Sequence, residues 1–169
     1  MEPGKARIRA RRELKRSDLK AALQEPNVRA FLRAIRLGEG TLDEAGYYRI
    51  VGGRIFTDDA QHPNVRVFIK RYNVWSTAAG AYQIINPTWR GLLKQYNFPD
   101  FSPECQDEAA VALIAGRLAL NDVIAGRFHL AVFKCSNEWA SLPGSTSGQR
   151  TESIASVEKV YLDAGGTIA

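Results

Sequence analysis

The stretch Ala109–Leu120 constrains the fold of this chain more than any other, because its side chains are apolar almost all round. A helix with one apolar stripe can lie at a surface, whereas a helix without a polar face has to be enclosed by other elements. Ser102-Pro103 supplies an N-cap followed by a proline at the first helical position, and Gly126 interrupts the pattern further along. We therefore predict a central helix with the rest of the chain packed around it.

Other segments carry apolar residues at helical spacing, and two segments read as strands. The predicted helices are a short one through Leu19 that Pro26 ends, then residues 28–39, 86–96, 127–139 and 151–164, with N-caps at Ser17 or Asp18, at Asn86 and at Thr151. The predicted strands are two short ones in residues 49–57, around Gly52-Gly53, and an edge strand in residues 65–70. The fold class is therefore α+β, with a small antiparallel sheet or hairpin lobe packed on a helical lobe.

Length and charge divide the chain into a basic N-terminal extension, residues 1–26, and one domain, residues 27–169. The extension holds eight basic and four acidic side chains, so it contributes a charge of +4 to the net charge of +5. Its charged start is not followed by the apolar core of a secretory signal, and no segment approaches the roughly 18 apolar residues of a membrane span. We expect a protein made in the cytoplasm without a signal peptide.

The two cysteines and two histidines give no sign of a metal site or of a nucleophile with its base. Cys105 and Cys135 have neither a CxxC partner nor metal-ligand spacing, and a reducing compartment favours buried thiols over a disulfide. His62 and His129 stand far apart in the sequence, without matching carboxylate motifs. We expect neither a metal nor a cofactor.

Glu39 lies where a carboxylic acid would keep its proton. The apolar stripe that begins at Val28 and Phe31 returns to Glu39 at the end of the predicted helix, with Gly40 as the stop signal. Low dielectric and the negative end of the helix dipole both raise the pKa of a carboxyl group in that place. Such a group is the proton donor that cleavage of a glycosidic bond requires, although a glutamate in a last turn is more often a solvated surface residue.

A series of short motifs along the chain also resembles a known protein family. In chain order they are Gly38-Glu39-Gly40-Thr41, Ile50-Val51-Gly52-Gly53, Phe56-Thr57-Asp58, His62-Pro63, Ser76-Thr77-Ala78-Ala79-Gly80-Ala81-Tyr82-Gln83, Phe101-Ser102-Pro103, Gln106-Asp107, Cys135-Ser136-Asn137 and Trp139-Ala140-Ser141-Leu142-Pro143-Gly144. Each motif is weak alone, but the ordered series closely resembles the phage lambda endolysin family of peptidoglycan lytic transglycosylases. The resemblance runs from about Val28 to Gly166.

The resemblance implies a lysozyme-like fold with the active-site cleft between the two lobes, and Glu39 as the general acid and base. Its substrate would be bacterial peptidoglycan, cleaved at the β-1,4 bond between N-acetylmuramic acid and N-acetylglucosamine. The product would be 1,6-anhydromuramic acid, no water would be consumed, and the host cell would lyse. Such a bacteriolytic enzyme would be a monomer that reaches the periplasm and cell wall after holin-dependent release, or is delivered with the virion.

Several residues are candidates for holding the glycan. Gly80-Ala81-Tyr82-Gln83 resembles the Gly-x-x-Gln element of such enzymes, in which a ring packs on a sugar and an amide binds its hydroxyls, although these residues could simply close a turn. The other candidates are Ser76 and Thr77 as hydroxyl donors, Tyr48 and Trp75 as stacking rings, Asp58 as a carboxylate ligand or a turn cap, and Ser141 as part of the cleft wall.

Two other functions remain open. A hydrolytic muramidase would need a second carboxylate, and T4-type phage lysozymes have an aspartate nine residues after the glutamate, where Tyr48 stands here. Asp43, Glu44, Asp58 or Asp59 would have to supply it, with Asp58 and Asp59 favoured. A catalytically silent wall-binding or virion protein would have no use for a buried acid. The extension lacks interleaved aromatic residues, so we expect attraction to anionic bacterial surfaces rather than to nucleic acid, with a solvated tail as the alternative.

Overall fold

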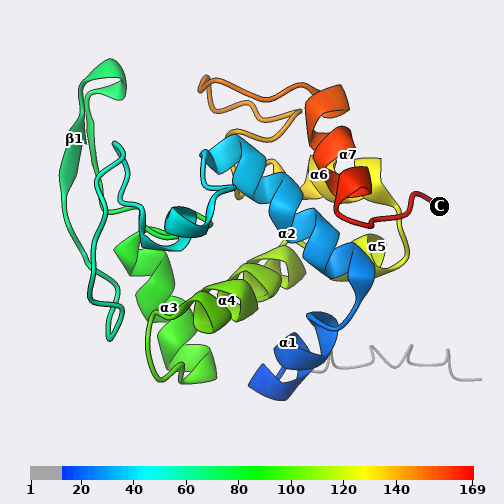
Figure 1. Cartoon of the computed structure of the whole chain (residues 1–169), viewed down its shortest axis with the longest axis horizontal. Coiled ribbons are helices and arrows are strands. Elements are labelled where there is room, and N and C mark those ends of the chain that lie inside the picture. Colours follow the sequence, from blue (N-terminus) through cyan, green and yellow to red (C-terminus); the bar gives the residue numbers. More distant parts are fainter. Residues whose placement is uncertain (1–12) are drawn as a thin grey trace, which may run out of the picture.

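The computed structural model describes residues 13–169 and confirms the α+β class (Figure 1). Within these residues the chain forms helices, two short 3-10 turns and a two-stranded sheet. In order, the elements are α1 (Arg16–Ala22), α2 (Pro26–Glu39), a 3-10 turn (Glu44–Tyr48), β1 (Val67–Ile69), a second 3-10 turn (Lys70–Tyr72), β2 (Val74–Ser76), α3 (Asn86–Tyr96), α4 (Pro103–Gly116), α5 (Leu120–Ile124), α6 (Phe128–Cys135) and α7 (Ile154–Asp163).

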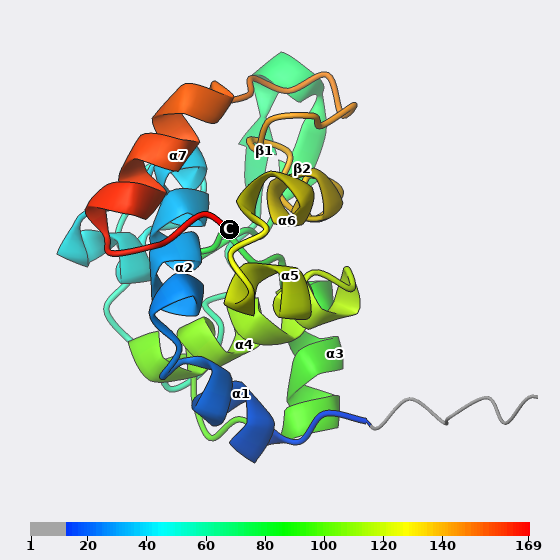
Figure 2. The ribbon, with the colours of Figure 1, turned by 90° about the vertical axis from the view of Figure 1, so that its right-hand side faces the viewer.

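The predicted central helix is α4, which contacts α1, α2, α3 and α5. Figures 1 and 2 show it running through the helical body with these helices around it. Its predicted N-cap is confirmed, since the Ser102 hydroxyl accepts a hydrogen bond from the Cys105 amide. The helix ends at Gly116 rather than at Leu120, because Leu118 adopts a φ of +60°, which a right-handed helix cannot contain. The chain then starts again as α5.

The helix that carries Glu39 is α2, and it packs mainly against the last helix, α7. Gly40 ends α2 in the left-handed region, as predicted, with φ of +69°. Pro26 begins α2 but does not end α1 as predicted, because α1 already stops at Ala22. The N-cap of α7 is Ser153 rather than the predicted Thr151, because the Ser153 hydroxyl is the one that accepts a hydrogen bond from a first-turn amide, that of Ser156.

The other two predicted caps are also wrong. Ile85 rather than Asn86 caps α3, and Lys15 rather than Ser17 or Asp18 precedes α1. Asp18 nevertheless contributes to this end of the helix, because its carboxylate accepts a hydrogen bond from the Lys15 amide over 2.8 Å.

The sheet is smaller than predicted and lies in a different place. β1 falls within the predicted edge strand, but its antiparallel partner is β2, with Val67 opposite Ser76. Residues 49–57 form isolated bridges, from Arg49 to Ile55 and from Ile50 to Ala79, and no strand. Hydrogen bonds from the Ile50 amide to the Arg54 carbonyl and from the Phe56 amide to the Tyr48 carbonyl join the two arms of the predicted hairpin. The Val51 amide bonds to the Ala78 carbonyl instead, so no regular ladder forms between the arms. In Figure 1 the β1–β2 ribbon stands at the left of the helical body.

Residues 13–26 are part of the packed body. Leu19 of α1 is fully buried, and the Arg16 guanidinium donates to the Glu108 carboxylate on α4 over 2.6 Å. The boundary that we predicted after residue 26 therefore does not coincide with an edge of the hydrophobic core. The rest of the basic extension, residues 1–12, lies outside the described residues.

Two further features of the described chain concern its thiols and its helices. Cys105 and Cys135 are free and buried, which confirms the prediction of buried thiols. Burial raises the pKa of the Cys135 thiol to about 12, so that it stays protonated. Among residues 13–169, no helix combines the length and the apolar character that crossing a bilayer demands.

Candidate active site

A cleft of about 450 Å³ lies at the C-terminal end of α2. One wall comes from the β1–β2 ribbon and the segments next to it, including Ile69, Val74 and Ser76. The opposite wall comes from the chain that follows α6, including Trp139, Ser141 and Arg150. Figure 1 shows the ribbon and the orange segment before α7 on either side of the end of α2. The cleft thus lies between the small sheet and the helical body.

Glu39, the last residue of α2, projects its carboxyl group into this cleft and is only partly accessible. The Ser141 hydroxyl donates a hydrogen bond of 2.8 Å to the Glu39 Oε1. Removal from water raises the pKa of Glu39 to about 7, and the hydrogen bond from Ser141 acts in the opposite direction but is the weaker effect. A carboxyl group with this pKa can give up and take back a proton near neutral pH.

Gly38 lets Ser141 reach Glu39. A Cβ at position 38 would overlap the Ser141 hydroxyl, so a glycine is needed where the two segments cross. Ser141 is held there by its neighbours, because Leu142 is buried and the Trp139 indole donates to the Tyr82 carbonyl over 3.1 Å. This role of Gly38 could not be predicted from the sequence, since it depends on two segments about one hundred residues apart.

Three of the residues predicted to bind substrate line the cleft with Glu39, namely Ser76, Gln83 and Ser141. The Gln83 side-chain amide donates to the carbonyls of Arg49 and Gly80, which fixes the orientation of its head group. Its Oε1 makes no hydrogen bond within residues 13–169. The Ser76 hydroxyl accepts from the Ala78 amide and keeps its own proton for another acceptor.

Tyr82 does not lie in this cleft, which corrects the prediction that its ring packs on a sugar. The residue is 2% exposed, and its hydroxyl donates to Asp107, which does not line the cleft either, over 2.6 Å. The fold itself requires a glycine at position 80, since the φ of Gly80 is +82° and a Cβ there would overlap the Gln106 side chain. Within this element only Gln83 faces the cleft.

Thr77 and Trp75 are likewise outside the cleft. The Thr77 hydroxyl accepts from the Asn86 amide over 2.8 Å and so supports the start of α3. Trp75 stands between two cleft-lining residues of β2 and therefore points to the opposite face of the ribbon, where it is 60% exposed. There it packs against Phe68, with the Arg66 guanidinium 5.0 Å from the centre of its ring.

Tyr48 and Asp58 also lie outside the cleft. Tyr48 packs against Phe56, and its hydroxyl donates to Asp59 over 3.1 Å. Asp58 is a turn cap, the alternative that we left open, because its carboxylate accepts from the Ala60 amide over 2.9 Å. Neither Asp58 nor Asp59 lines the cleft that holds Glu39.

The second carboxylate in the cleft is Glu138, which the sequence analysis did not single out. Arg117 donates to Glu138 over 2.8 Å, so the charge of this carboxylate is already neutralised by an ion pair. The available signal was its position directly before Trp139, a buried residue that begins one of the motifs of the resemblance.

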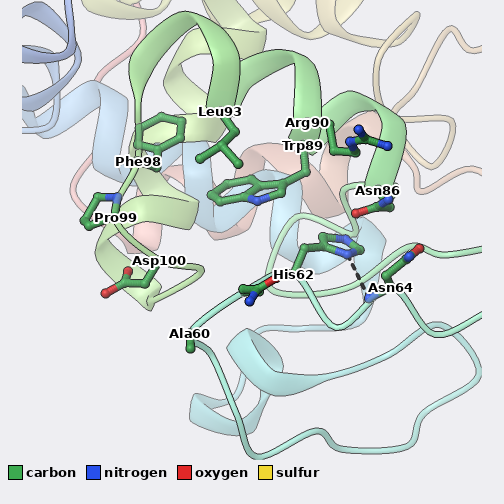
Figure 3. A pocket seen from close by; sticks show the side chains of 11 residues that line it. Ala60, His62, Asn64, Asn86, Trp89, Arg90, Leu93, Phe98, Pro99 and Asp100 are labelled. Atoms are coloured by element: carbon green, nitrogen blue, oxygen red, sulfur yellow. Dashed lines mark hydrogen bonds between the residues drawn. The ribbon is translucent and has the colours of Figure 1, made fainter.

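A separate hollow of about 430 Å³ lies beside α3 and contains neither Glu39 nor Glu138 (Figure 3). Its histidine, His62, uses both ring nitrogens in the fold. Nε2 bonds to the Ile84 carbonyl over 2.7 Å, and Nδ1 accepts from the Asn64 amide. Burial lowers the pKa of His62 and so favours the neutral ring. With both nitrogens bonded to the backbone, His62 has a structural role, because it connects two loops. Within the described residues, no cluster of three or more His, Cys, Asp or Glu side chains could hold a metal ion.

Comparisons with known proteins identify relatives of this chain. The profile of the Endolysin family matches residues 29–168. The endolysin of Escherichia phage P2 is 41% identical over 158 residues, which cover 85% of this chain and 95% of that protein. The endolysin of Escherichia phage lambda is 38% identical over 146 residues, covering 83% and 92%.

Solved structures of bacteriophage lambda lysozyme share the fold. One, complexed with a chitohexasaccharide, superimposes with a TM-score of 0.80 at 37% identity and covers 85% of this chain and 97% of its own. A second has a TM-score of 0.77 at 36% identity, with the same coverage. The chain belongs to the endolysin family, the lysozyme-like enzymes with which phages lyse the bacterial cell wall.

Proposed function

We propose that this endolysin cleaves the β-1,4 bond between N-acetylmuramic acid and N-acetylglucosamine in peptidoglycan without hydrolysis, leaving a 1,6-anhydromuramic acid end. The observation that carries the proposal is a single available carboxyl group, Glu39, with a pKa of about 7 in a cleft whose other carboxylate is ion-paired. The lambda lysozyme that was solved with a chitohexasaccharide supports a glycan strand as the occupant of this cleft.

In the first step, the proton of Glu39 passes to the oxygen that links the two sugars. The bond between this oxygen and the anomeric carbon of muramic acid breaks, its electron pair stays with the leaving N-acetylglucosamine, and the muramic acid ring takes on oxocarbenium character. Glu39 becomes a carboxylate, which the Ser141 hydroxyl stabilises because it donates to Oε1. Proton transfer of this kind contributes about 10²–10⁴-fold to a rate.

In the second step, the Glu39 carboxylate takes the proton from the C6 hydroxyl of the same muramic acid. The C6 oxygen bonds to the anomeric carbon, which closes the anhydro ring and returns Glu39 to its neutral form. Gln83 and Ser76 would bind sugar hydroxyl or N-acetyl groups from the opposite wall, where both line the cleft. No second carboxylate is needed, because the nucleophile belongs to the substrate.

Hydrolysis is the alternative function, and it would use Glu138 rather than Asp58 or Asp59, which lie outside the cleft. Arg117 already occupies Glu138 in an ion pair of 2.8 Å, whereas the carboxyl group of Glu39 has no charged partner there within residues 13–169. Mass spectrometry of the fragments released from purified peptidoglycan tests this choice. Fragments lighter by one water, without a reducing end, support the proposal, whereas reducing muramic acid ends would establish hydrolysis. Intact peptidoglycan would leave a silent wall-binding protein.

We further propose that the basic extension draws the protein to anionic bacterial surfaces once it has left the cytoplasm, either through a holin or with the virion. Charge alone supports this, since residues 1–26 hold eight basic side chains against four acidic ones. Removing residues 1–12 tests the idea while retaining α1. The shortened protein should bind anionic vesicles less tightly at low salt, and equal binding of both proteins would count against it.

A further inference from the structure

Arg150 is the charged residue of the cleft that the proposed chemistry leaves without a role. The ionisable side chains that line the cleft include Glu39, Glu138 and Arg150. Glu39 is partly neutral at pH 7, and Arg117 balances the charge of Glu138. The Arg150 side chain makes no hydrogen bond or ion pair within the part of the chain that the structure describes. The cleft therefore presents one uncompensated positive charge to its occupant.

A backbone hydrogen bond fixes the segment that carries Arg150 to Ser141, the residue that contacts Glu39. Two residues further on, the Glu152 amide donates to the Ser141 carbonyl over 2.8 Å, while the Ser141 hydroxyl holds Glu39. On the other side, the Gln149 amide donates to the Ser147 hydroxyl, which stabilises the turn before Arg150. The guanidinium thus projects from a segment that is anchored beside the reacting carboxyl group.

The sugar rings of peptidoglycan are N-acetylated and carry no charge of their own. The negative charges nearest to the cleaved bond are on the lactyl branch of muramic acid. They are the carboxylates of the attached stem peptide or, where the peptide has been removed, the lactyl carboxylate itself. A guanidinium binds a carboxylate through two parallel N–H groups, which makes arginine well suited to this contact.

We propose that Arg150 binds a carboxylate on the muramic acid branch, so that the cleft selects charged peptidoglycan strands over neutral glycans with the same backbone. This inference rests on the proposed function, because it assigns the substrate branch to the same cleft. An exposed pair of this kind changes affinity by about fivefold. The contact should weaken with rising salt, because the guanidinium remains in contact with water.

Binding by the full-length Glu39→Gln protein tests the inference without turnover. Three soluble glycans serve as probes: strands that carry stem peptides, strands stripped of them by an amidase, and neutral chitohexaose. Titration calorimetry would compare that protein with versions that also contain Arg150→Gln or Arg150→Lys. Arg90→Gln is the matched control, because Arg90 is an exposed arginine in the separate hollow beside α3.

We expect Arg150→Gln to weaken binding of charged strands about fivefold, Arg150→Lys to retain part of the affinity, and Arg90→Gln to match the parent protein. A loss confined to strands with stem peptides assigns the contact to a peptide carboxylate, and a loss on stripped strands assigns it to the lactyl group. Equal losses on chitohexaose, or no loss on any glycan, would overturn the inference. Failure of the parent protein to bind any of the three would overturn the proposed function as well.

Discussion

At the scale of single residues, the chemistry of Glu39 results from two opposing effects. Burial disfavours its charged form, and the hydrogen bond from Ser141 favours it. Burial is the stronger effect, and the pKa of Glu39 rises to about 7. The residue therefore holds a proton for part of the time at the pH at which it would donate one, which an ordinary surface glutamate does not.

Glu39→Gln should keep the fold and abolish lysis, because the amide is nearly isosteric but cannot donate the proton. We expect a loss of activity of at least about 10²-fold. Turbidity of permeabilised cells measures lysis, and circular dichroism verifies the fold. Glu138→Gln is the control within the same cleft and should cost less than about tenfold. Lysis that survives in Glu39→Gln would contradict the mechanism.

Ser141→Ala should raise the pKa of Glu39 further, because it removes the hydrogen bond that favours the carboxylate. In the proposed mechanism the free enzyme needs Glu39 protonated, so its kcat/KM would fall as pH rises through this pKa. The alkaline limb of the pH profile should therefore move to higher pH in the variant. Ser76→Ala, in the opposite wall, should leave the limb in place. An unchanged limb in Ser141→Ala would refute the assigned contact.

At the scale of elements, the site is made where the end of α2 meets the chain that follows α6. The Glu39–Ser141 hydrogen bond joins residues 102 positions apart in the sequence. The crossing is tight enough that only a glycine fits at position 38. The geometry of the site therefore depends on how these two segments pack and not on either segment alone.

Gly38→Ala should displace Ser141 and reduce activity, because its new methyl group would overlap the Ser141 hydroxyl. Overpacking of this kind costs about 1–3 kcal/mol of stability. Gly91→Ala is the matched control on α3, since a Cβ at Gly91 meets nothing within 4 Å. It should stabilise that helix by up to about 1 kcal/mol. Thermal unfolding and lysis assays compare the two, and equal behaviour would contradict the close approach.

The sequence predicts the helices better than the sheet, and the acid better than its surroundings. The stripe of α3 and the Ser102-Pro103 start of α4 are local patterns, so these helices can be predicted without knowledge of their neighbours. β1 and β2 are three residues each, and their pairing is set by tertiary contacts. The burial of Glu39 could be predicted because this residue lies on the apolar stripe of α2. The roles of Gly38, Glu138 and Arg150 could not, because they arise from contacts between distant segments.

At the scale of the whole molecule, α1 completes the helical body on the side away from α7 (Figure 2). Its Arg16 is the hydrogen-bonding partner of Glu108, a carboxylate that is 4% exposed on the central helix. A charge buried to this degree is tolerated only with a partner. Part of the basic N-terminal region is therefore structural.

Arg16→Ala should destabilise the fold by about 2 kcal/mol or more, because it leaves Glu108 charged and unpaired in the interior. Adding Glu108→Gln should restore part of this loss, since the neutral amide costs less to bury. Lys159→Ala breaks a pair that is exposed on both sides and should change stability by less than about 1 kcal/mol. Urea unfolding measures all three, and a loss as small as that of Lys159→Ala would contradict the role of Arg16.

The long separation between Glu39 and Ser141 also sets a time at which the enzyme can become active during synthesis. A ribosome makes Glu39 early, but Ser141 and α7, against which α2 packs, emerge more than one hundred residues later. Until then the carboxyl group stays in water and ionises as an ordinary glutamate. In a growing chain Glu39 is therefore a carboxylate at neutral pH, and it begins to hold a proton there only after α7 has folded onto α2.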